Sequence, residues 1–196
     1  MARRLVLVLL LCSATVLAAG APAQAKSSCS AARSPGSTIV VKTTEAVVYT
    51  RGSNLYGCLT RHLPRVLPNE GGGWDLTGSD GPQLSGRYVA FTTFGSGIGD
   101  EADRVYVYDL KVGKTFLIVP SNFVTALVLK RNGSVAWIDA PNADTEQPVW
   151  QVRKYAHEER QGAILVDRGA DIDNQSLTLA PDRNTIVWTR GGTQRT

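Results

Sequence analysis

The chain has 196 residues, with 21 Lys and Arg against 17 Asp and Glu. Two of the basic residues, Arg3 and Arg4, lie in a predicted signal segment, so the rest of the chain has 19 basic and 17 acidic residues. This near-balance, with the basic residues scattered, excludes the charge signature of a nucleic-acid-binding protein, and no nucleic-acid partner is expected.

Residues 1–25 have the features of a secretory signal peptide. Two arginines are followed by the apolar run Leu5–Leu11 and by Ala-Gln-Ala at 23–25, a small-x-small cleavage site. The apolar run has about half of the roughly 20 residues that a membrane span needs, and no later stretch is as apolar. We expect a secreted protein without a membrane span. Cleavage leaves 171 of the 196 residues, enough for one domain, and the first of them, residues 26–36, are predicted to be a flexible leader.

Of the three cysteines, Cys12 lies in the signal, and Cys29 and Cys58 remain as a pair in an oxidising compartment. We predict a disulfide between them that pins the leader onto the first sheet. The alternative, a redox or metal-binding pair, lacks the Cys-x-x-Cys or Cys/His spacing that such sites use.

Beyond residue 37 the chain consists of short runs rich in Val, Ile, Thr, Tyr and Trp, separated by Gly, Asn, Asp and Pro, which predicts an all-β fold. A pattern of four strands recurs. The first copy contains segments 39–41, 45–49, 54–58 and 63–67. The second contains 74–76, 85–91, 104–109 and 114–119. The third contains 124–129, 131–137, 149–153 and 163–166. The fourth contains only 177–179 and 181–188.

Four aromatic residues mark the same place in each copy: Tyr49, Phe91, Trp137 and Trp188. They are 42, 46 and 51 residues apart, the period of a four-stranded propeller blade. We therefore predict a propeller-like stack of three to four four-stranded blades, at about 37–68, 73–119, 123–167 and, in part, 174–196. The aromatic residues are expected in the core between blades rather than at a ligand site.

The segments LSGRYVAF (84–91) and RVYVYDLKVGK (104–114) resemble the TolB-type β-propeller repeat, and LAPDRNTIVW (179–188) is a further copy in which Arg183 replaces a glycine. The last 26 residues also resemble the C-terminal ends of secreted actinobacterial proteins of this type. The resemblance implies the fold and a role as an interaction platform, as in most TolB-like domains. It transfers no binding residue, because no binding motif of the family matches.

The fourth copy lacks its outer strands, so an open sheet edge is expected, and unpaired backbone groups at an edge invite pairing. We consider three occupants of this edge. The segment 39–42 could complete the last blade of its own chain, a second chain could pair with it, or a protein partner could add a strand.

No nucleophile, phosphate-loop or dinucleotide motif is present, and no catalytic or cofactor-binding residue is assigned. Two groups of oxygen ligands suit a hard cation such as Ca²⁺. One comprises Asp100, Glu101 and Asp103, and the other comprises Asp167, Asp171, Asp173 and Asn174. Neither group follows the EF-hand spacing, and ordinary solvated β-turns are rich in the same residues, so turns are the favoured interpretation.

Two functional hypotheses remain. The first is a secreted, non-enzymatic binding or scaffold protein whose loops or sheet edge contact a partner. The second is a secreted or envelope enzyme acting on polysaccharide, in which the loop carboxylates of Asp75, Asp100, Glu101 or Asp173 converge for acid/base catalysis.

Overall fold

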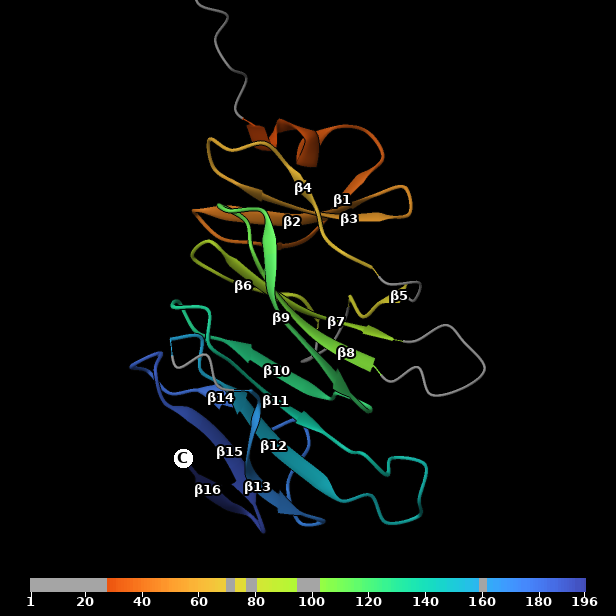
Figure 1. The fold of residues 1–196 in the computed structure, drawn as a ribbon, viewed down its shortest axis with the longest axis vertical. Coiled ribbons are helices and arrows are strands. Elements are labelled where there is room, and N and C mark those ends of the chain that lie inside the picture. The colour runs from red at the N-terminus through yellow and green to blue at the C-terminus, as the bar shows by residue number, and fades with distance from the viewer. Residues whose placement is uncertain (1–27, 70–72, 77–80, 95–102, 159–161) are drawn as a thin grey trace, which may run out of the picture.

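The computed structural model describes residues 28–69, 73–76, 81–94, 103–158 and 162–196. Within these residues, sixteen strands form four antiparallel sheets, which confirms the all-β prediction (Figure 1). The predicted signal peptide lies outside the described residues. In the part of the chain that is described, no helix has the length and apolar character needed to cross a bilayer.

The first two sheets come from residues 37–121. The first sheet has the order β1 (Ser37–Lys42), β2 (Ala46–Arg51), β3 (Asn54–Leu59) and β4 (Arg65–Val66). In the second sheet the order is β5 (Gly73–Trp74), β7 (Tyr88–Phe94), β8 (Asp103–Asp109) and β9 (Lys114–Ser121), and β6 (Gln83–Ser85) also pairs with β7. Tight hairpins connect most neighbours because Gly and Asn residues stand where the chain reverses.

The last two sheets repeat this arrangement. The third sheet has the order β10 (Ala126–Leu129), β11 (Val135–Asp139), β12 (Trp150–Tyr155) and β13 (Ile164–Gly169). The fourth sheet has the order β14 (Thr178–Leu179), β15 (Ile186–Arg190) and β16 (Thr193–Arg195). We call β1, β6, β10 and β14 the inner strands. Each of them comes directly before the first tight turn of its sheet.

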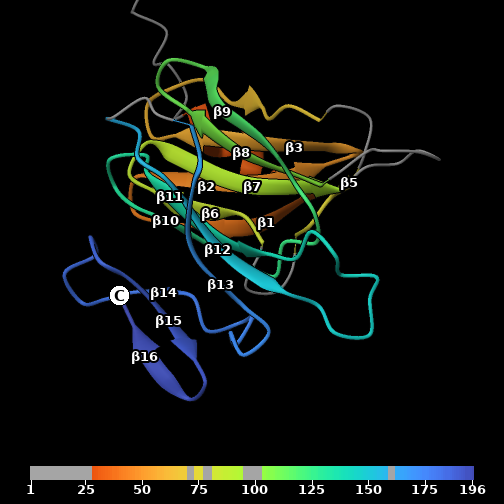
Figure 2. The ribbon, with the colours of Figure 1, turned by 60° about the horizontal axis from the view of Figure 1, so that its bottom comes forward.

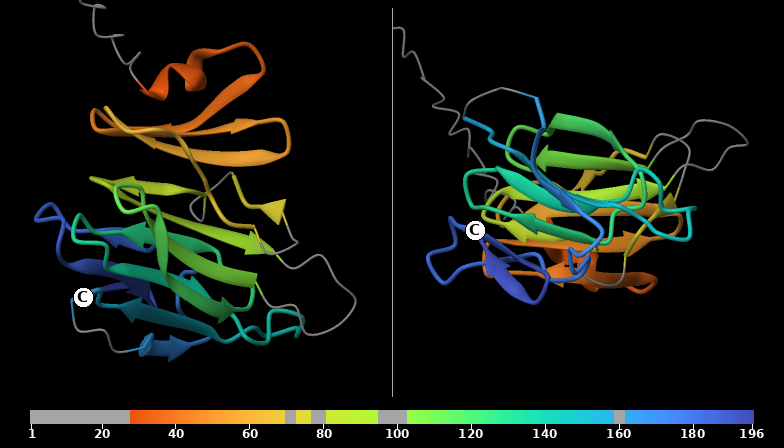
Figure 3. Two further views of the ribbon diagram at one scale, coloured as in Figure 1. Left: turned by 45° about the horizontal axis from the view of Figure 1, so that its top comes forward. Right: turned by 90° about the horizontal axis from the view of Figure 1, so that it is seen from below.

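The first three sheets lie one above the other in chain order, and the fourth sheet lies beside the third (Figure 3, left). Each gap between neighbouring sheets is filled by its own buried apolar cluster. The inner strands β1, β6 and β10 lie close together, so the sheets fan out from a common side, which Figure 2 shows from a second direction. The four-layer stack fits a set of propeller-like blades, and it does not close into a barrel.

The four predicted aromatic residues occupy equivalent places in the core. Phe91 packs toward the first sheet, Trp137 toward the second and Trp188 toward the third, and each of them is at most 4% exposed. Tyr49, 1% exposed, packs instead against η1, the 3-10 helix Ser28–Arg33. Each aromatic side chain thus faces the layer that precedes its own sheet, and η1 is the layer that precedes the first sheet.

A disulfide joins Cys29 of η1 to Cys58 of β3, as the cysteine count predicts. With it, Ala32 of η1 and the residues Val47 and Tyr49 of β2 form one buried cluster on the outer face of the first sheet. Residues 28–36 of the predicted leader are thereby held against the sheet as a cap.

Three expectations about strands need correction. First, residues 39–42 belong to β1, which pairs with β2, so they do not complete the fourth sheet. Second, the fourth sheet has a third strand, β16, where none was predicted. Third, the strand before the turn at Gly86 is β6 rather than 74–76, because β5 pairs with the far end of β7.

Candidate functional site

The turns that follow the inner strands meet at one end of the stack, which we call the turn end and which lies at the left of Figure 1. A hollow of about 190 Å³ lies between them. Its lining comes from all four sheets: Thr43, Thr44, Glu45, Leu84, Ser85, Gly86, Leu129, Arg131, Leu179 and Arg183. The three leucines stand at or next to the ends of β6, β10 and β14, so the repeat places equivalent side chains around one point. We call this the central hollow.

The central hollow has an excess of positive charge. Arg131 Nη2 lies 2.7 Å from Glu45 Oε1, and this ion pair connects the turns of the third and first sheets. Both side chains are exposed, so the pair contributes at most about 1 kcal/mol to stability. Arg183, whose backbone φ is +57°, lines the same hollow and forms no ion pair with the described residues. Two guanidinium groups therefore face one carboxylate, which favours an anionic group in a partner.

A further hollow of about 240 Å³ lies at the same end, on the third sheet. Its charged lining residues are Lys130, Lys154 and Glu158, so it has an excess of one positive charge. Burial and, second, the charge of Lys154 lower the pKa of Lys130. The carboxylate of Asp182 acts in the opposite direction on Lys130. The Asp182 carboxylate stays ionised at low pH, because hydrogen bonds, first from the Thr185 hydroxyl and then from the backbone, lower its pKa to about 2. A bound anion would stabilise the two ammonium groups.

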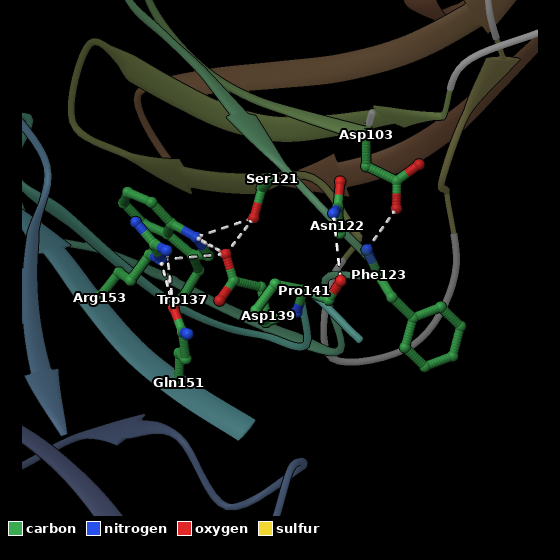
Figure 4. Close-up of polar contacts among 9 residues, drawn as sticks. All are labelled: Asp103, Ser121, Asn122, Phe123, Trp137, Asp139, Pro141, Gln151 and Arg153. Carbon is green, nitrogen blue, oxygen red and sulfur yellow. Dashed lines mark hydrogen bonds and ion pairs between the residues drawn. The ribbon is translucent and has the colours of Figure 1, made fainter. Parts of the chain in front are cut away.

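The opposite end, which we call the loop end, contains a buried polar network between the second and third sheets (Figure 4). Asp139 is 2% exposed, and its Oδ2 accepts hydrogen bonds from the Ser121 hydroxyl and from Trp137 Nε1, the latter at 3.2 Å. Arg153 Nε lies 3.3 Å from the same oxygen, and its guanidinium also donates to Gln151 Oε1. The second carboxylate oxygen, Oδ1, has no hydrogen-bond partner among the described residues.

This network joins β9, β11 and β12 and leaves little freedom to its members. An ionised carboxylate in the core is stabilised only when it is paired and hydrogen-bonded, as Asp139 is through Oδ2. Sequence analysis did not find these residues, because no local motif links positions 121, 139 and 153. The one available signal was a polar residue, Asp139, at the end of an otherwise apolar run, residues 135–138.

Asp103, one of the predicted calcium ligands, lies at this loop end, near Asp75, one of the carboxylates considered for catalysis. Asp103 Oδ2 accepts a hydrogen bond from the backbone N–H of Phe123 at 3.0 Å, where the chain adopts a φ of +51°. Burial raises the pKa of Asp103, and the nearby charge of Asp75 adds to this rise. The structure thus brings Asp75 close enough to Asp103 for their charges to interact. Asp100 and Glu101 lie outside the described residues.

The second acidic group is engaged with an arginine. Arg190 Nη1 lies 2.6 Å from Asp167 Oδ1, and Arg190 Nε lies 3.0 Å from Asp171 Oδ1. Partial burial would raise the pKa of Asp167, but the hydrogen bond from Trp188 Nε1 and other contacts outweigh it and lower the pKa. These contacts use the oxygens that a calcium ion would need.

Two further residues of that group also have roles within the chain. Asp173 Oδ1 accepts a hydrogen bond from the Gln175 backbone at 3.1 Å, as in an ordinary turn, and the Asn174 carbonyl accepts one from the Thr125 hydroxyl at 2.7 Å. Among the described residues, no group of three or more His, Cys, Asp or Glu side chains is placed to hold a metal ion. Asp167 and Asp171 form ion pairs with Arg190, and Asp173 accepts a turn hydrogen bond.

No family model matches the chain, and no curated protein matches it.

Proposed function

We propose that this chain is a secreted, non-enzymatic binding protein built from propeller-like blades of the TolB-like type, and that its turn end is the surface that contacts a partner. The observation that carries the proposal is the convergence of the turns of all four sheets on the central hollow. Loops held by a rigid repeat scaffold are where repeat proteins usually place their binding residues.

The charges of the turn end support a partner with anionic groups. Arg131 and Arg183 line the central hollow, and Lys130 and Lys154 line the hollow next to it. Rim charges of this kind act mainly through the rate of association and through the choice of partner. We therefore expect binding to weaken as the salt concentration rises.

Charge reversal at the central hollow tests the proposal. The mature, oxidised protein is immobilised and exposed to the medium and envelope proteins of the producing cell, beside the variants Arg131→Glu and Arg183→Glu. Lys111→Glu is the matched control, because Lys111 is exposed in the β8–β9 turn and does not line the hollow. Near-UV circular dichroism verifies that each variant folds.

The proposal expects that a partner retained by the wild type and by Lys111→Glu is lost with both hollow variants. Retention by all four proteins would place the binding surface elsewhere. If none of the four proteins retains a partner and the wild type cleaves an envelope polysaccharide, the enzymatic function described next would be favoured.

That second function, acid/base hydrolysis of a polysaccharide, is favoured by the raised pKa of Asp103 beside Asp75. A carboxyl group with a raised pKa near a second carboxylate is the combination that glycoside hydrolysis uses. Release of reducing ends from envelope polysaccharide, abolished by Asp103→Asn and retained by Asp167→Asn, would establish it.

Self-association through the sheet edge is the other contact we propose. Among the described residues, β16 pairs only with β15, so its other edge offers backbone groups to a second strand. The solution mass, measured by size-exclusion chromatography with light scattering, distinguishes a dimer from a monomer.

A further inference from the structure

A groove of about 790 Å³ lies between η1 and the β1–β2 hairpin, next to the disulfide. This volume is within the range of roughly 300–1,000 Å³ that is usual for small-molecule sites. It is larger than either hollow of the turn end described above, and it shares Thr43 and Thr44 with the central hollow. We call it the cap groove.

The floor of the cap groove is aliphatic. Val47 of β2 and Ala32 of η1 are buried there, Ile39 of β1 is 44% exposed, and Ala46, which also borders the groove, packs toward the second sheet. None of the described residues that line the groove is aromatic. The groove therefore offers apolar contact without the ring platforms on which nucleotide bases stack.

Three cationic side chains, Arg33, Lys42 and Arg61, line the same groove. No described lining residue is acidic, and none of the three forms an ion pair with the residues that the structure describes. The nearest carboxylate along the chain, Glu45, pairs with Arg131 instead. Charge complementarity thus selects an anionic ligand.

Two of the hydroxyl groups that line the groove are engaged with the backbone. The Thr60 hydroxyl donates to the Glu45 carbonyl at 2.8 Å, and Thr43 Oγ1 accepts a hydrogen bond from the Ala46 N–H at 3.1 Å. The hydroxyls of Ser30 and Thr44 complete the polar part of the lining. An aliphatic floor beside a cluster of cations matches an aliphatic chain that ends in one anionic group.

We propose that the cap groove binds a long-chain fatty acid, with its carboxylate at Arg33, Lys42 and Arg61 and its acyl chain along the aliphatic floor. Buried methylene groups each contribute favourable transfer free energy, and the cations supply charge-assisted hydrogen bonds to the carboxylate. The site lies beside the cap and does not depend on the partner binding proposed for the central hollow.

The test is a fluorescence titration of the mature, oxidised protein with cis-parinaric acid, whose emission rises in apolar surroundings. Three ten-carbon competitors are compared below their micelle concentrations: decanoate, decanol and decyltrimethylammonium. They share the chain and differ in the charge of the head group. We expect decanoate to displace the probe at least tenfold more effectively than decanol, and decyltrimethylammonium to be weaker still.

Three exposed basic residues provide the matched variants. Lys42→Gln and Arg61→Gln each remove one charge from the groove, and Lys111→Gln removes one from a turn outside it. Each groove variant should weaken decanoate binding by about three- to tenfold, as expected for one charge-assisted hydrogen bond. The Lys111 variant should bind like the wild type. All three positions are exposed, so the variants are expected to fold.

A methyl-labelled NMR spectrum locates the chain. The Ile39 methyl signals should shift on addition of decanoate and stay in place on addition of acetate, which has the charge but no chain. Any of three results would overturn the proposal: no saturable rise in probe fluorescence, equal displacement by decanol and decanoate, or the same affinity in the groove variants and the wild type.

Discussion

Removing the disulfide should destabilise the protein by an amount that its loop length predicts. Cys29 and Cys58 are 29 residues apart in the chain. The chain-entropy relation gives about 3.6 kcal/mol for a loop of this size at 25 °C. In a domain of this length, 1 kcal/mol corresponds to roughly 2–4 °C, so the melting temperature should fall by about 7–14 °C.

The assay is urea unfolding of the oxidised wild type, the reduced wild type and the double variant Cys29→Ala, Cys58→Ala. The reduced protein and the double variant should lose similar amounts of free energy of unfolding, and reductant should leave the double variant unchanged. Near-UV circular dichroism reports on the cap, because the rings of Tyr49 and Tyr56 stack 5.2 Å apart beneath it. A loss below about 1 kcal/mol in both proteins would refute the idea that the bridge stabilises the fold by holding the cap.

Three further predictions concern the core and one turn. Asp139→Asn should cost about 2–4 kcal/mol in urea unfolding, because it removes the charge that a partly buried guanidinium faces, and a cost below about 0.5 kcal/mol would contradict this. Gly57→Ala should lower the free energy of unfolding by about 1–3 kcal/mol, because a Cβ there would lie 2.3 Å from a leucine side chain that belongs to the second sheet. Gly162→Ala has open space around it and should be neutral or slightly stabilising. Equal effects of the two substitutions would argue against close packing of the sheets. In an NMR titration, Asp182 should have a pKa of about 2, and this pKa should rise in Thr185→Val. Because the folded-state pKa is lower than the ordinary value of about 4, the contribution of Asp182 to stability is present above about pH 4 and is lost as the pH falls toward 2. An unchanged pKa in the variant would show that the Thr185 hydroxyl does not stabilise the ionised carboxylate.

Strands with a local signal were predictable from the sequence. Tyr88–Phe94 and Asp103–Asp109 contain alternating or continuous apolar runs between turn residues, and both form strands at nearly the predicted positions. The disulfide was predictable as well, because only one pairing remained after the signal was set aside. The strand predictions depend only on residues that are neighbours in the sequence, and the disulfide prediction depends only on the number of cysteines.

Strands without such a signal were missed. Thr193–Arg195 is polar throughout and fully exposed, so nothing in its composition distinguishes β16 from a loop. Gln83–Ser85 is too short to show a period, and the nearby Trp74 is more apolar, which led to the wrong inner strand for the second sheet. In both cases the pairing partner, rather than the segment itself, determines the structure.

The candidate sites depend still more on pairing across the stack. Arg131 lies 86 residues from the Glu45 that it contacts, and the cationic groups of the cap groove come from η1, β1 and the loop after β3. Sequence analysis could recognise acidic turns but could not place Arg190 beside Asp167 and Asp171. The ion pairs of Asp167 and Asp171 with Arg190 are therefore visible only in the folded chain.

The two outer faces of the stack explain why the sheets need no closed ring to bury their apolar surface. In the lower three sheets, an aromatic side chain packs against the preceding sheet, and in the first sheet Tyr49 packs against η1 in the same way. At the other end, Ile186 and Trp188 face the third sheet, so the alternate residues of β15 face outward. On that other face Val187 pairs with Thr178 and is only 7% exposed, and Thr189 pairs with Gln194. A repeat stack is stable in water when its terminal layers are capped or polar, and here the disulfide-held η1 caps the first sheet. A further blade stacked on the first sheet would have to displace η1.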